Sequence, residues 1–313
     1  METILVTGGA GFIGSHLCER LRKEGKRVIV VDDFNNFYDP AVKRANADLL
    51  RMQGCTVHEL DIRSPKLAEL FAAEAITAVI HLAARAGVRP SLQDPMLYAQ
   101  VNIAGTLNLL ELCRKYGVQR FIFGSSSSVY GTNQKVPFSE ADQTDHPMSP
   151  YAISKIAAEQ YCKIYHQLFG LRITCLRFFT VYGPRGRPDM AVYKFTEAVR
   201  EGGEILLFAG GKLKRDFTYV TDIVEGIVAA LDRNHPFEII NLGNAHPISV
   251  QQLVNVIEQI LGQKAKLQQA PAQPGDVPIT YADIAKAKRL LDWEPKVGIE
   301  EGMKQFCDWF ASR

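Results

Sequence analysis

The stretch TGGAGFIG, residues 7–14, decides the fold of this chain. It follows a short apolar run, TILVT (3–7), and opens a helical pattern at 12–24. Gly9, Gly11 and Gly14 satisfy the spacing G-x-G-x-x-G, and Gly8, Gly11 and Gly14 satisfy the related G-x-x-G-x-x-G. Glycines here permit a tight turn and let a pyrophosphate approach the helix N-terminus, where free N–H groups favour an anion. We therefore expect a dinucleotide-binding βαβ unit.

The runs that follow alternate between strand and helix patterns. Apolar runs at 27–32, 56–60, 78–83, 120–125 and 172–178 are typical of strands buried on both faces, because they are continuous rather than alternating. Helical patterns at 97–116 and 149–169 lie between later runs. This order predicts an α/β protein with a Rossmann-type, doubly wound parallel sheet.

Beyond residue 177 the pattern is less regular and predicts a smaller C-terminal α/β domain over the carboxyl edge of the sheet, where ligands of such sheets bind. Helices are expected at 189–202, 249–262 and 299–311, and a strand at 237–243. Ser249 is a suitable N-cap and Gly262 a suitable stop. We divide the chain into a cofactor-binding Rossmann domain, residues 1–176 and 219–245, and a substrate-binding domain, residues 177–218 and 246–313.

An acidic residue at the end of the second strand selects the cofactor. Asp32 stands where a carboxylate accepts hydrogen bonds from ribose hydroxyls and repels a 2′-phosphate, which favours NAD over NADP. Asp61, after the third strand, is either an adenine neighbour or a helix cap, and His81 is interpreted as a satisfied core histidine. The expected cofactor contacts are Gly8, Gly11, Phe12, Ile13, Gly14, Asp32, Asp61, Ile62, Leu82, Ala83, Ala84, Tyr151 and Lys155.

The composition argues against several classes of function. The formal net charge is only +2, unlike that of a protein with a nucleic-acid-binding face. The six cysteines include no C-x-x-C pair, so reduced core thiols are expected rather than disulfides or a metal site. No apolar run approaches transmembrane length, and the first strand begins too early to leave room for a signal peptide. We expect a cytoplasmic protein with no metal, nucleic-acid or membrane partner.

A second pattern carries the chemistry. Tyr151 and Lys155 of YAISK are spaced i and i+4 in a helical pattern, which places both on one helix face. A tyrosine with an ordinary pKa of about 10 is a poor base, but an adjacent ammonium and a cationic nicotinamide ring would lower that pKa. The tyrosine could then take a proton from an alcohol while hydride leaves the same carbon. A hydroxyl of GSSSSVYG (124–131) would complete the hydrogen bonds around the reacting oxygen.

The motifs TGGAGFIG, GSSSSVYG, YAISK and RDFTYVTDIV together resemble the extended short-chain dehydrogenase/reductase family, specifically its nucleotide-sugar epimerases and dehydratases, over nearly the whole chain. The resemblance implies NAD, a C-terminal domain that binds a nucleotide diphosphate sugar, and a homodimer. Apolar faces on helices 97–116 and 151–169 suit a dimer. By motif, Tyr151 is the base, Lys155 holds the ribose and tunes that base, Ser126 completes the triad, and Ser127 and Ser128 face the sugar.

The serine stretch also bears on the reaction type. In the dehydratases of the family the corresponding stretch resembles T-D-E-V-Y-G, and in the UDP-glucuronate decarboxylases it resembles T-S-E-V-Y-G. Here both intervening positions are serine, so no carboxylate is available in this stretch. Dehydration and decarboxylation are therefore less favoured than a redox-neutral epimerisation.

The stretch RFFTVYGPRGRPDMA, residues 177–191, indicates the sugar. Thr180 takes the place of the asparagine of R-Y-F-N in UDP-galactose/UDP-glucose 4-epimerases, and this stretch and RAGVRPSLQDP (85–95) resemble the UDP-glucuronate 4-epimerases. The resemblance implies that Thr180, with Arg187 or Arg89, binds the C6 carboxylate of a uronic acid; the arginines could instead form surface ion pairs or bind phosphate. Further expected contacts are Arg215 at the diphosphate, Lys194 near the nucleotide and Asp276 on the uridine side.

The activity that these patterns predict is NAD-dependent epimerisation at C4 of UDP-glucuronate to UDP-galacturonate through a 4-keto intermediate. Two other activities stay open, 4-epimerisation of UDP-glucose and UDP-galactose, and decarboxylation of UDP-glucuronate. Outside catalysis, an NAD-binding sensor or a structural dimer module could use the same fold. The presence of both Tyr151 and Lys155 argues against the sensor.

Overall fold

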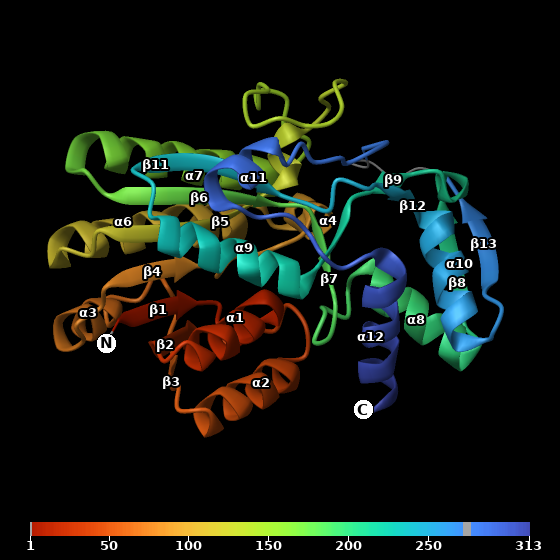
Figure 1. Ribbon diagram of the computed structural model, residues 1–313, viewed down its shortest axis with the longest axis horizontal. Helices are drawn as coiled ribbons and strands as arrows, with labels where there is room; N and C mark the ends of the chain where they lie inside the picture. Colours follow the sequence, from red (N-terminus) through yellow and green to blue (C-terminus); the bar gives the residue numbers. More distant parts are fainter. Residues whose placement is uncertain (1, 272–276) are drawn as a thin grey trace.

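A seven-stranded parallel sheet forms the centre of the computed structural model, which describes residues 2–271 and 277–313 (Figure 1). Its strands are β1 (Thr3–Thr7), β2 (Arg27–Asp32), β3 (Thr56–Glu59), β4 (Ala78–His81), β5 (Arg120–Ser126), β6 (Arg172–Phe178) and β11 (Phe237–Leu242). Their order across the sheet is β11-β6-β5-β4-β1-β2-β3. The direction of this order reverses between β1 and β4, which places a ligand crevice at the carboxyl ends of those strands. The predicted doubly wound sheet is confirmed.

Both faces of the sheet are buried, because alternate residues of its strands enter two different cores. In β1, Ile4 and Val6 pack into one cluster and Leu5 into the other, and all three are fully buried. The first cluster contains side chains of α1 (Phe12–Lys23), α2 (Pro40–Met52), α9 (Val220–Arg233) and α11 (Ala285–Leu291). The second contains side chains of α3 (Leu67–Ala73), α6 (Gly105–Tyr116) and α7 (Pro150–Phe169). Continuous apolar runs in the strands therefore reflect helices on both faces.

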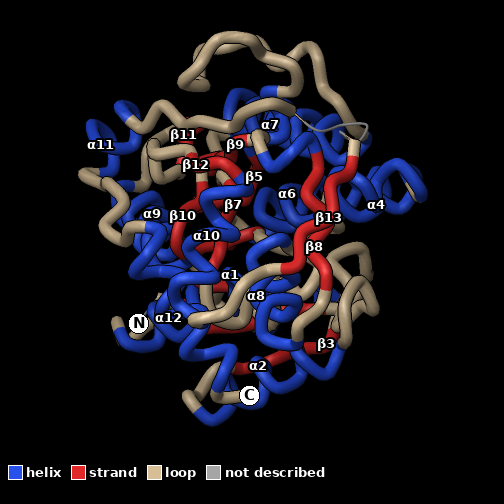
Figure 2. The backbone as a smooth tube through the Cα atoms, turned by 90° about the vertical axis from the view of Figure 1, so that its right-hand side faces the viewer, coloured by secondary structure: helices blue, strands red, loops and turns tan. Residues whose placement is uncertain are grey.

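The C-terminal elements gather beside one end of the sheet and have an apolar cluster of their own (Figure 1). Their helices are α8 (Ala191–Glu201), α10 (Val250–Leu261) and α12 (Ile299–Ala311). Three short strand pairs accompany them: β7 (Thr180–Tyr182) with β10 (Phe217–Tyr219), β9 (Lys214–Arg215) with β12 (Ile248–Ser249), and β8 (Glu204–Phe208) with β13 (Lys266–Ala270). Figure 2, which looks at this side, shows β8 and β13 side by side. The division into domains at residues 176, 219 and 245 stays a prediction.

The local signals for α7 and α10 act as the sequence suggests. Ser149 caps α7 by accepting a hydrogen bond from the N–H of Ala152, and Gly170 ends it in the left-handed region at φ +72°. Ser249 forms a capping box with Gln252 at the start of α10. The helix expected at 97–116 is interrupted, because α5 (Pro95–Tyr98) passes through a π-helical segment, Ala99–Ala104, before α6 begins. In the described part of the chain, no helix has the length and apolar character needed to cross a membrane.

Candidate active site

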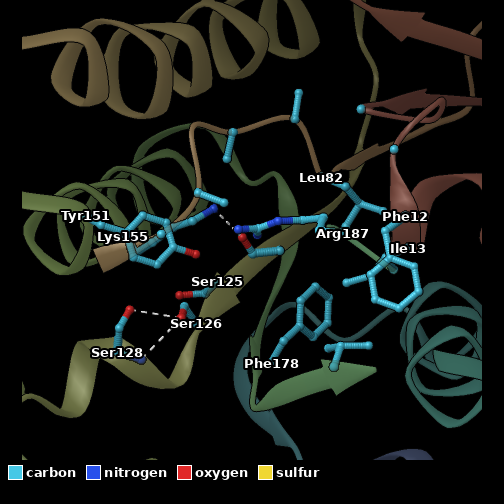
Figure 3. A pocket seen from close by; sticks show the side chains of 18 of the residues that line it. Phe12, Ile13, Leu82, Ser125, Ser126, Ser128, Tyr151, Lys155, Phe178 and Arg187 are labelled. Carbon is cyan, nitrogen blue, oxygen red and sulfur yellow. Dashed lines mark hydrogen bonds between the residues drawn. The ribbon is translucent and has the colours of Figure 1, made fainter. Parts of the chain in front are cut away.

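A cavity of about 500 Å³ opens at the carboxyl ends of the central strands, between the sheet and the C-terminal elements. Figure 3 shows Tyr151, Lys155, Ser126 and Arg187 gathered around it. Segments that are distant in the sequence thus meet in one place, because parallel strands end on the same edge of the sheet. The predicted site residues that line the cavity are Gly8, Gly11, Phe12, Ile13, Gly14, Asp32, Asp61, Ile62, Leu82, Ala83, Ala84, Arg89, Ser126, Ser127, Ser128, Tyr151, Lys155, Thr180, Arg187 and Arg215.

The glycine-rich turn has the shape that a bound pyrophosphate needs. Gly8 adopts φ +69°, and a Cβ there would lie 2.7 Å from the backbone nitrogen of Ala83. A Cβ on Gly14 would lie 2.2 Å from the carbonyl oxygen of Gly8, so only glycine lets α1 pack this close to the turn. Helix α1 begins at Phe12 with no side-chain cap, which leaves its first N–H groups to face the cavity. The turn and the helix start therefore fit the diphosphate of a dinucleotide.

Asp32 ends β2 at the rim of this turn and is buried. Its carboxylate accepts hydrogen bonds from the N–H groups of Ala10 (3.2 Å) and Phe34 (3.0 Å). Burial raises the pKa of the Asp32 carboxyl, and these bonds and the nearby Lys43 ammonium oppose that rise. Lys43 also lines the cavity and donates to the carbonyl oxygen of Asn35 at 3.0 Å. The sequence reasoning did not identify Lys43, which lies in α2, or Asn35, which lies in the loop after the second strand.

Asp61 follows β3 and lines the cavity. Its carboxylate accepts from the backbone N–H of Arg63 at 2.8 Å and from the Arg63 guanidinium at 2.6 Å. These hydrogen bonds hold the pKa of Asp61 below its usual value. The residue at the N-cap of α3 is Lys66, so Asp61 does not cap that helix. The place of Asp61 in the cavity wall is compatible with the predicted role beside the adenine.

Tyr151 and Lys155 lie on the face of α7 that points into the cavity (Figure 3). The Lys155 ammonium is 5.9 Å from the centre of the Tyr151 ring, but it donates its hydrogen bond to the carbonyl oxygen of Gly124, at 2.7 Å. Burial lowers the pKa of Lys155 to about 8. Burial also raises the pKa of Tyr151, against the lowering effects of the Ser126 hydroxyl and the Arg187 cation. The role of Lys155 in lowering the pKa of Tyr151 stays a prediction.

Ser126 starts a turn that presents further hydroxyls to the cavity. It is the N-cap of the 3-10 helix Ser127–Tyr130, and its Oγ accepts from the N–H of Ser128 at 3.2 Å. The hydroxyl of Ser128 donates to the same Oγ at 2.9 Å. Ser126 thus receives hydrogen bonds from one side and faces Tyr151 on the other, as Figure 3 shows. Ser127 lines the cavity beside them.

Thr180 and Arg187 reach the cavity from the C-terminal elements. Thr180 opens β7, and its N–H is bonded to the carbonyl oxygen of Asp216 at 3.0 Å. The Arg187 guanidinium forms two hydrogen bonds with Asp189, from Nε at 2.9 Å and from Nη2 at 2.6 Å. Arg187 and Tyr151 line the same cavity, and the charge of Arg187 lowers the pKa of Tyr151 against the effect of burial. The ion pair that the sequence left open is present: Arg187 lines the cavity, and its partner Asp189 is exposed outside the lining.

The other predicted substrate contacts are placed with different outcomes. Arg89, on α4 (Val88–Gln93), stacks over the Phe208 ring at 5.1 Å and so bridges the cavity mouth to the end of β8. Arg215 lines the cavity and donates to the carbonyl oxygen of Val277 at 2.9 Å. Lys194 is exposed on α8 and does not appear among the cavity-lining residues that the structure describes. Asp276 lies outside the described residues.

A buried polar network lies behind the cavity, and the sequence pointed to its His81 but not to its Asn102. His81 is fully satisfied, with Thr7 at 2.7 Å and Thr106 at 2.9 Å, and burial lowers its pKa to about 3, so the interpretation as a core histidine is confirmed. Asn102, in the π-helical segment, donates to Ser154 on α7 at 2.9 Å. It also binds the backbone N–H and carbonyl of Arg85, in the loop after β4. The network joins the floor of the glycine turn to the helix that carries Tyr151.

A tyrosine and lysine on one helix face, beside a glycine cradle at the edge of a doubly wound sheet, define a dehydrogenase-like enzyme of the short-chain type. The chain belongs to the NAD dependent epimerase/dehydratase family, whose sequence model matches residues 4–243. It is 46% identical over 313 residues to the UDP-glucuronate 4-epimerase of Thermodesulfobacterium geofontis, with 99% of this chain and 96% of that protein covered.

Solved structures agree with this assignment. The UDP-glucuronic acid 4-epimerase from Bacillus cereus, in complex with UDP-glucuronic acid and NAD, superposes with a TM-score of 0.93 at 37% identity, over 99% of both chains. A UDP-glucose 4-epimerase from Thermotoga maritima, with UDP-glucose, reaches a TM-score of 0.90 at 37% identity, again over 99% of both chains. The family resemblance drawn from the motifs is confirmed. The roles of individual site residues stay predictions.

Proposed function

We propose that this protein is an NAD-dependent UDP-glucuronate 4-epimerase, which interconverts UDP-glucuronate and UDP-galacturonate. The observation that carries the proposal is that Arg187 and Thr180 line the same cavity as Tyr151 and Lys155. A cation beside the base that acts at C4 suits a sugar with an anionic group on the neighbouring carbons. The relative from Thermodesulfobacterium geofontis and the Bacillus cereus structure support the same substrate.

The residues of the cavity suit a redox-neutral reaction. NAD, when bound, would accept a hydride from C4 of the sugar and later return it. Tyr151 would take the proton of the 4-hydroxyl as this hydride leaves, and would give it back at the end. Lys155 would hold the cofactor ribose and keep a positive charge near the phenolate, and Ser126 would donate a hydrogen bond to the reacting oxygen. Hydride and proton are both returned, so the product is an isomer of the substrate.

The C6 carboxylate creates a hazard that the site must control. Oxidation at C4 gives a 4-keto sugar whose carboxylate is β to the ketone, and such acids lose CO₂ when the C5–C6 bond aligns with the carbonyl π system. We propose that Thr180 and Arg187 hold the carboxylate away from this alignment while the ring turns to present its other face. Ser127 and Ser128 would bind the sugar without adding a carboxylate that could act as an acid or base. Arg215 remains the proposed contact to the diphosphate, Lys194 a contact near the nucleotide, Asp276 a contact on the uridine side, and Arg89 a second cation for the carboxylate or the phosphates.

The experiment that tests the function is proton NMR of the purified protein with UDP-glucuronate and no added NAD. We expect UDP-galacturonate to appear until the two sugars reach a constant ratio, which would also show that the cofactor copurifies. Formation of a UDP-pentose would instead identify a decarboxylase. No change with UDP-glucuronate, together with turnover of UDP-glucose or UDP-galactose, would move the function to neutral sugars and leave Arg187 to the diphosphate.

A matched pair of variants tests the carboxylate grip. Thr180→Val removes the hydroxyl and keeps the branched shape, whereas Thr180→Ser keeps the hydroxyl. Because one hydrogen bond to a charged group is worth about 1.5–3 kcal/mol, we expect Thr180→Val to lose roughly 10- to 100-fold in kcat/KM for UDP-glucuronate and to release more UDP-pentose. Thr180→Ser should stay near the parent protein. Equal behaviour of the two variants would remove Thr180 from the carboxylate site.

We further propose a cytoplasmic homodimer. The six cysteines are buried and free, which suits a reducing compartment. Helix α7 exposes a line of apolar side chains, which includes Ile164 (46% exposed) and Leu168 (67% exposed). Sedimentation at equilibrium should give twice the chain mass, and Leu168→Glu should shift it to the monomer. A monomeric parent protein would refute the dimer without affecting the proposed activity.

A further inference from the structure

The end of β5 is fastened to α7 by consecutive residues. The Gly124 carbonyl oxygen accepts from the Lys155 ammonium at 2.7 Å, and the next residue, Ser125, donates its hydroxyl to Oε1 of Glu159 at 2.5 Å. Ser126 follows directly and faces the phenol of Tyr151, as Figure 3 shows. Glu159 therefore binds Ser125. The neighbours of Ser125 in the chain are Gly124, which contacts Lys155, and Ser126, which faces Tyr151.

Glu159 belongs to a buried ion pair beneath the active site. Arg177 of β6 donates to its carboxylate from Nε at 3.0 Å and from Nη2 at 2.7 Å. Only 1% of the Glu159 side chain and 4% of the Arg177 side chain are exposed. The Arg177 guanidinium also stacks over the Tyr130 ring at 4.8 Å. Buried ion pairs add little net stability compared with apolar residues of the same volume, so the pair calls for an explanation other than stability.

We propose that Glu159 is a positioning residue for the reaction. Its carboxylate fixes Ser125, and with it the end of β5, against α7. Its charge, which Arg177 balances, keeps Lys155 in the ammonium form that Tyr151 needs. This inference rests on the proposed function for its kinetic readout. It concerns a carboxylate that does not line the cavity and is not expected to touch substrate or cofactor.

The charges around Lys155 support this role. Several titratable groups of the described residues face Lys155, Tyr151 or the ion pair, and they come from β4, β6, α5, α7, the turn after β5 and the loop after β7. These groups are His81, Tyr98, Tyr130, Glu159, Cys162, Cys175, Arg177 and Arg187. Burial keeps His81 neutral by lowering its pKa to about 3, keeps Tyr98 neutral by raising its pKa to about 12, and raises the pKa of the Cys175 thiol well above its usual value. Arg187 is paired with Asp189. Glu159 and Arg177 are therefore the charges that can be changed beside Lys155 without touching the cavity.

Removing each charge gives opposite predictions for the pH profile. Activity needs a deprotonated Tyr151 and a protonated Lys155, so its two limbs report the coupled titration of this pair. Glu159→Gln leaves the Arg177 cation unbalanced, which disfavours every protonated form nearby and should move both limbs of kcat to lower pH by about one unit. Arg177→Met leaves a buried anion and should move both limbs to higher pH. The double variant Glu159→Gln/Arg177→Met restores a neutral pair and should return the limbs close to those of the parent protein.

Two further variants separate charge from position. Ser125→Ala keeps both charges but breaks the link to β5, so kcat should fall several-fold with the limbs unmoved. Glu69→Gln makes the same chemical change at an exposed site on α3 and should alter neither. If Glu159→Gln does not fold, Arg177→Met and the double variant still give the comparison. A lower kcat with limbs in the parent position in all charge variants would reduce the pair to a structural role and overturn the proposal.

A second readout does not depend on the substrate. The NAD-loaded protein is titrated with pH while the ultraviolet difference absorbance of tyrosinate is followed, and the Tyr151→Phe protein supplies the background. We expect the Tyr151 titration to move to lower pH in Glu159→Gln and to higher pH in Arg177→Met. If the parent protein fails to convert UDP-glucuronate, the proposed function fails, but this titration still decides the inference. An unmoved titration in both variants would overturn it even if the epimerase activity is found.

Discussion

Gly14→Ala should separate cofactor binding from folding more cleanly than any change in the catalytic residues. A Cβ at this position would lie 2.2 Å from the Gly8 carbonyl oxygen and 2.7 Å from the Gly9 Cα, whereas ordinary contacts begin at 3.4 Å. The overlap with the oxygen is therefore 3.4 − 2.2 = 1.2 Å. Both neighbours are backbone atoms, so no side-chain rotation can relieve it, and the start of α1 must move away from the turn by about 1 Å.

The consequence should appear in NAD affinity before it appears in the fold. Overpacking of this kind costs about 1–3 kcal/mol of stability, which a chain of this size can tolerate. A shift of about 1 Å breaks one or two of the hydrogen bonds from the helix start to the pyrophosphate, each worth about 1.5–3 kcal/mol because the acceptor is charged. We expect NAD to bind roughly 10- to 10⁴-fold more weakly.

The assay is NAD binding to cofactor-stripped protein by titration calorimetry, with circular dichroism as the check on folding. Gly25→Ala is the matched control, because Gly25 also has a left-handed backbone, at φ +76°, but a Cβ there meets nothing within 4 Å. Gly25→Ala should lose about 1 kcal/mol of stability and no NAD affinity. A folded Gly14→Ala protein that binds NAD as tightly as the parent would refute the assignment of this turn to the pyrophosphate.

Three other predictions follow from the site and its surroundings. Tyr151→Phe should lower kcat about 10²- to 10⁴-fold with UDP-sugar affinity retained, measured by NMR turnover and calorimetry. Burial lowers the pKa of His16 to about 4, below the ordinary 6.5, so the unfolded state binds the proton more tightly than the folded state. The free energy of unfolding should therefore fall by up to ~3 kcal/mol as the pH decreases from about 6.5 to about 4. His16→Gln, which can still donate to the carbonyl oxygen of Pro184, should flatten this pH dependence in a series of denaturation curves. Asp189→Asn removes the carboxylate that pairs with Arg187, so KM for UDP-glucuronate should fall several-fold in steady-state kinetics, while an unchanged KM would separate Arg187 from the carboxylate.

The sequence predicted the elements whose signal is local. The seven strands of the central sheet appear within a residue or two of their expected positions. Burial on both faces makes the runs of the inner strands continuous, whereas the edge strand β3 is only partly buried. The short strands β7, β9, β10 and β12 have two or three residues each and carry no such pattern. Their pairing depends on contacts between distant segments, such as Thr180 with Phe217, that no window of sequence contains. The glycine-rich turn and Tyr151 with Lys155 were found because each motif lies within one turn or one helix.

The sequence could not predict which group each charged or polar side chain of the site contacts. Lys155 was expected beside Tyr151 and at the cofactor ribose, but its hydrogen bond to the carbonyl oxygen of Gly124 in β5 had no signal in the sequence. Asn102 gave no signal, because its partners lie in the loop after β4 and in α7, and its orientation depends on a π-helical segment. Interactions of this kind follow from how α7 packs on β5 and β6, and that packing is a property of the assembled sheet.

Two cations of the cavity, Arg187 and Lys43, share one feature that bears on turnover. Arg187 is paired with Asp189, and Lys43 lies near Asp32, so these cavity cations are balanced by acids of the same chain. A sugar carboxylate that approaches Arg187 must therefore share or replace Asp189, which limits how tightly it can be held. Under the proposed mechanism this limit is useful, because the ring of the 4-keto sugar has to rotate between the loss and the return of the hydride. A permanently exposed arginine would bind the ground state more strongly and resist that rotation, which would lower KM at the expense of kcat.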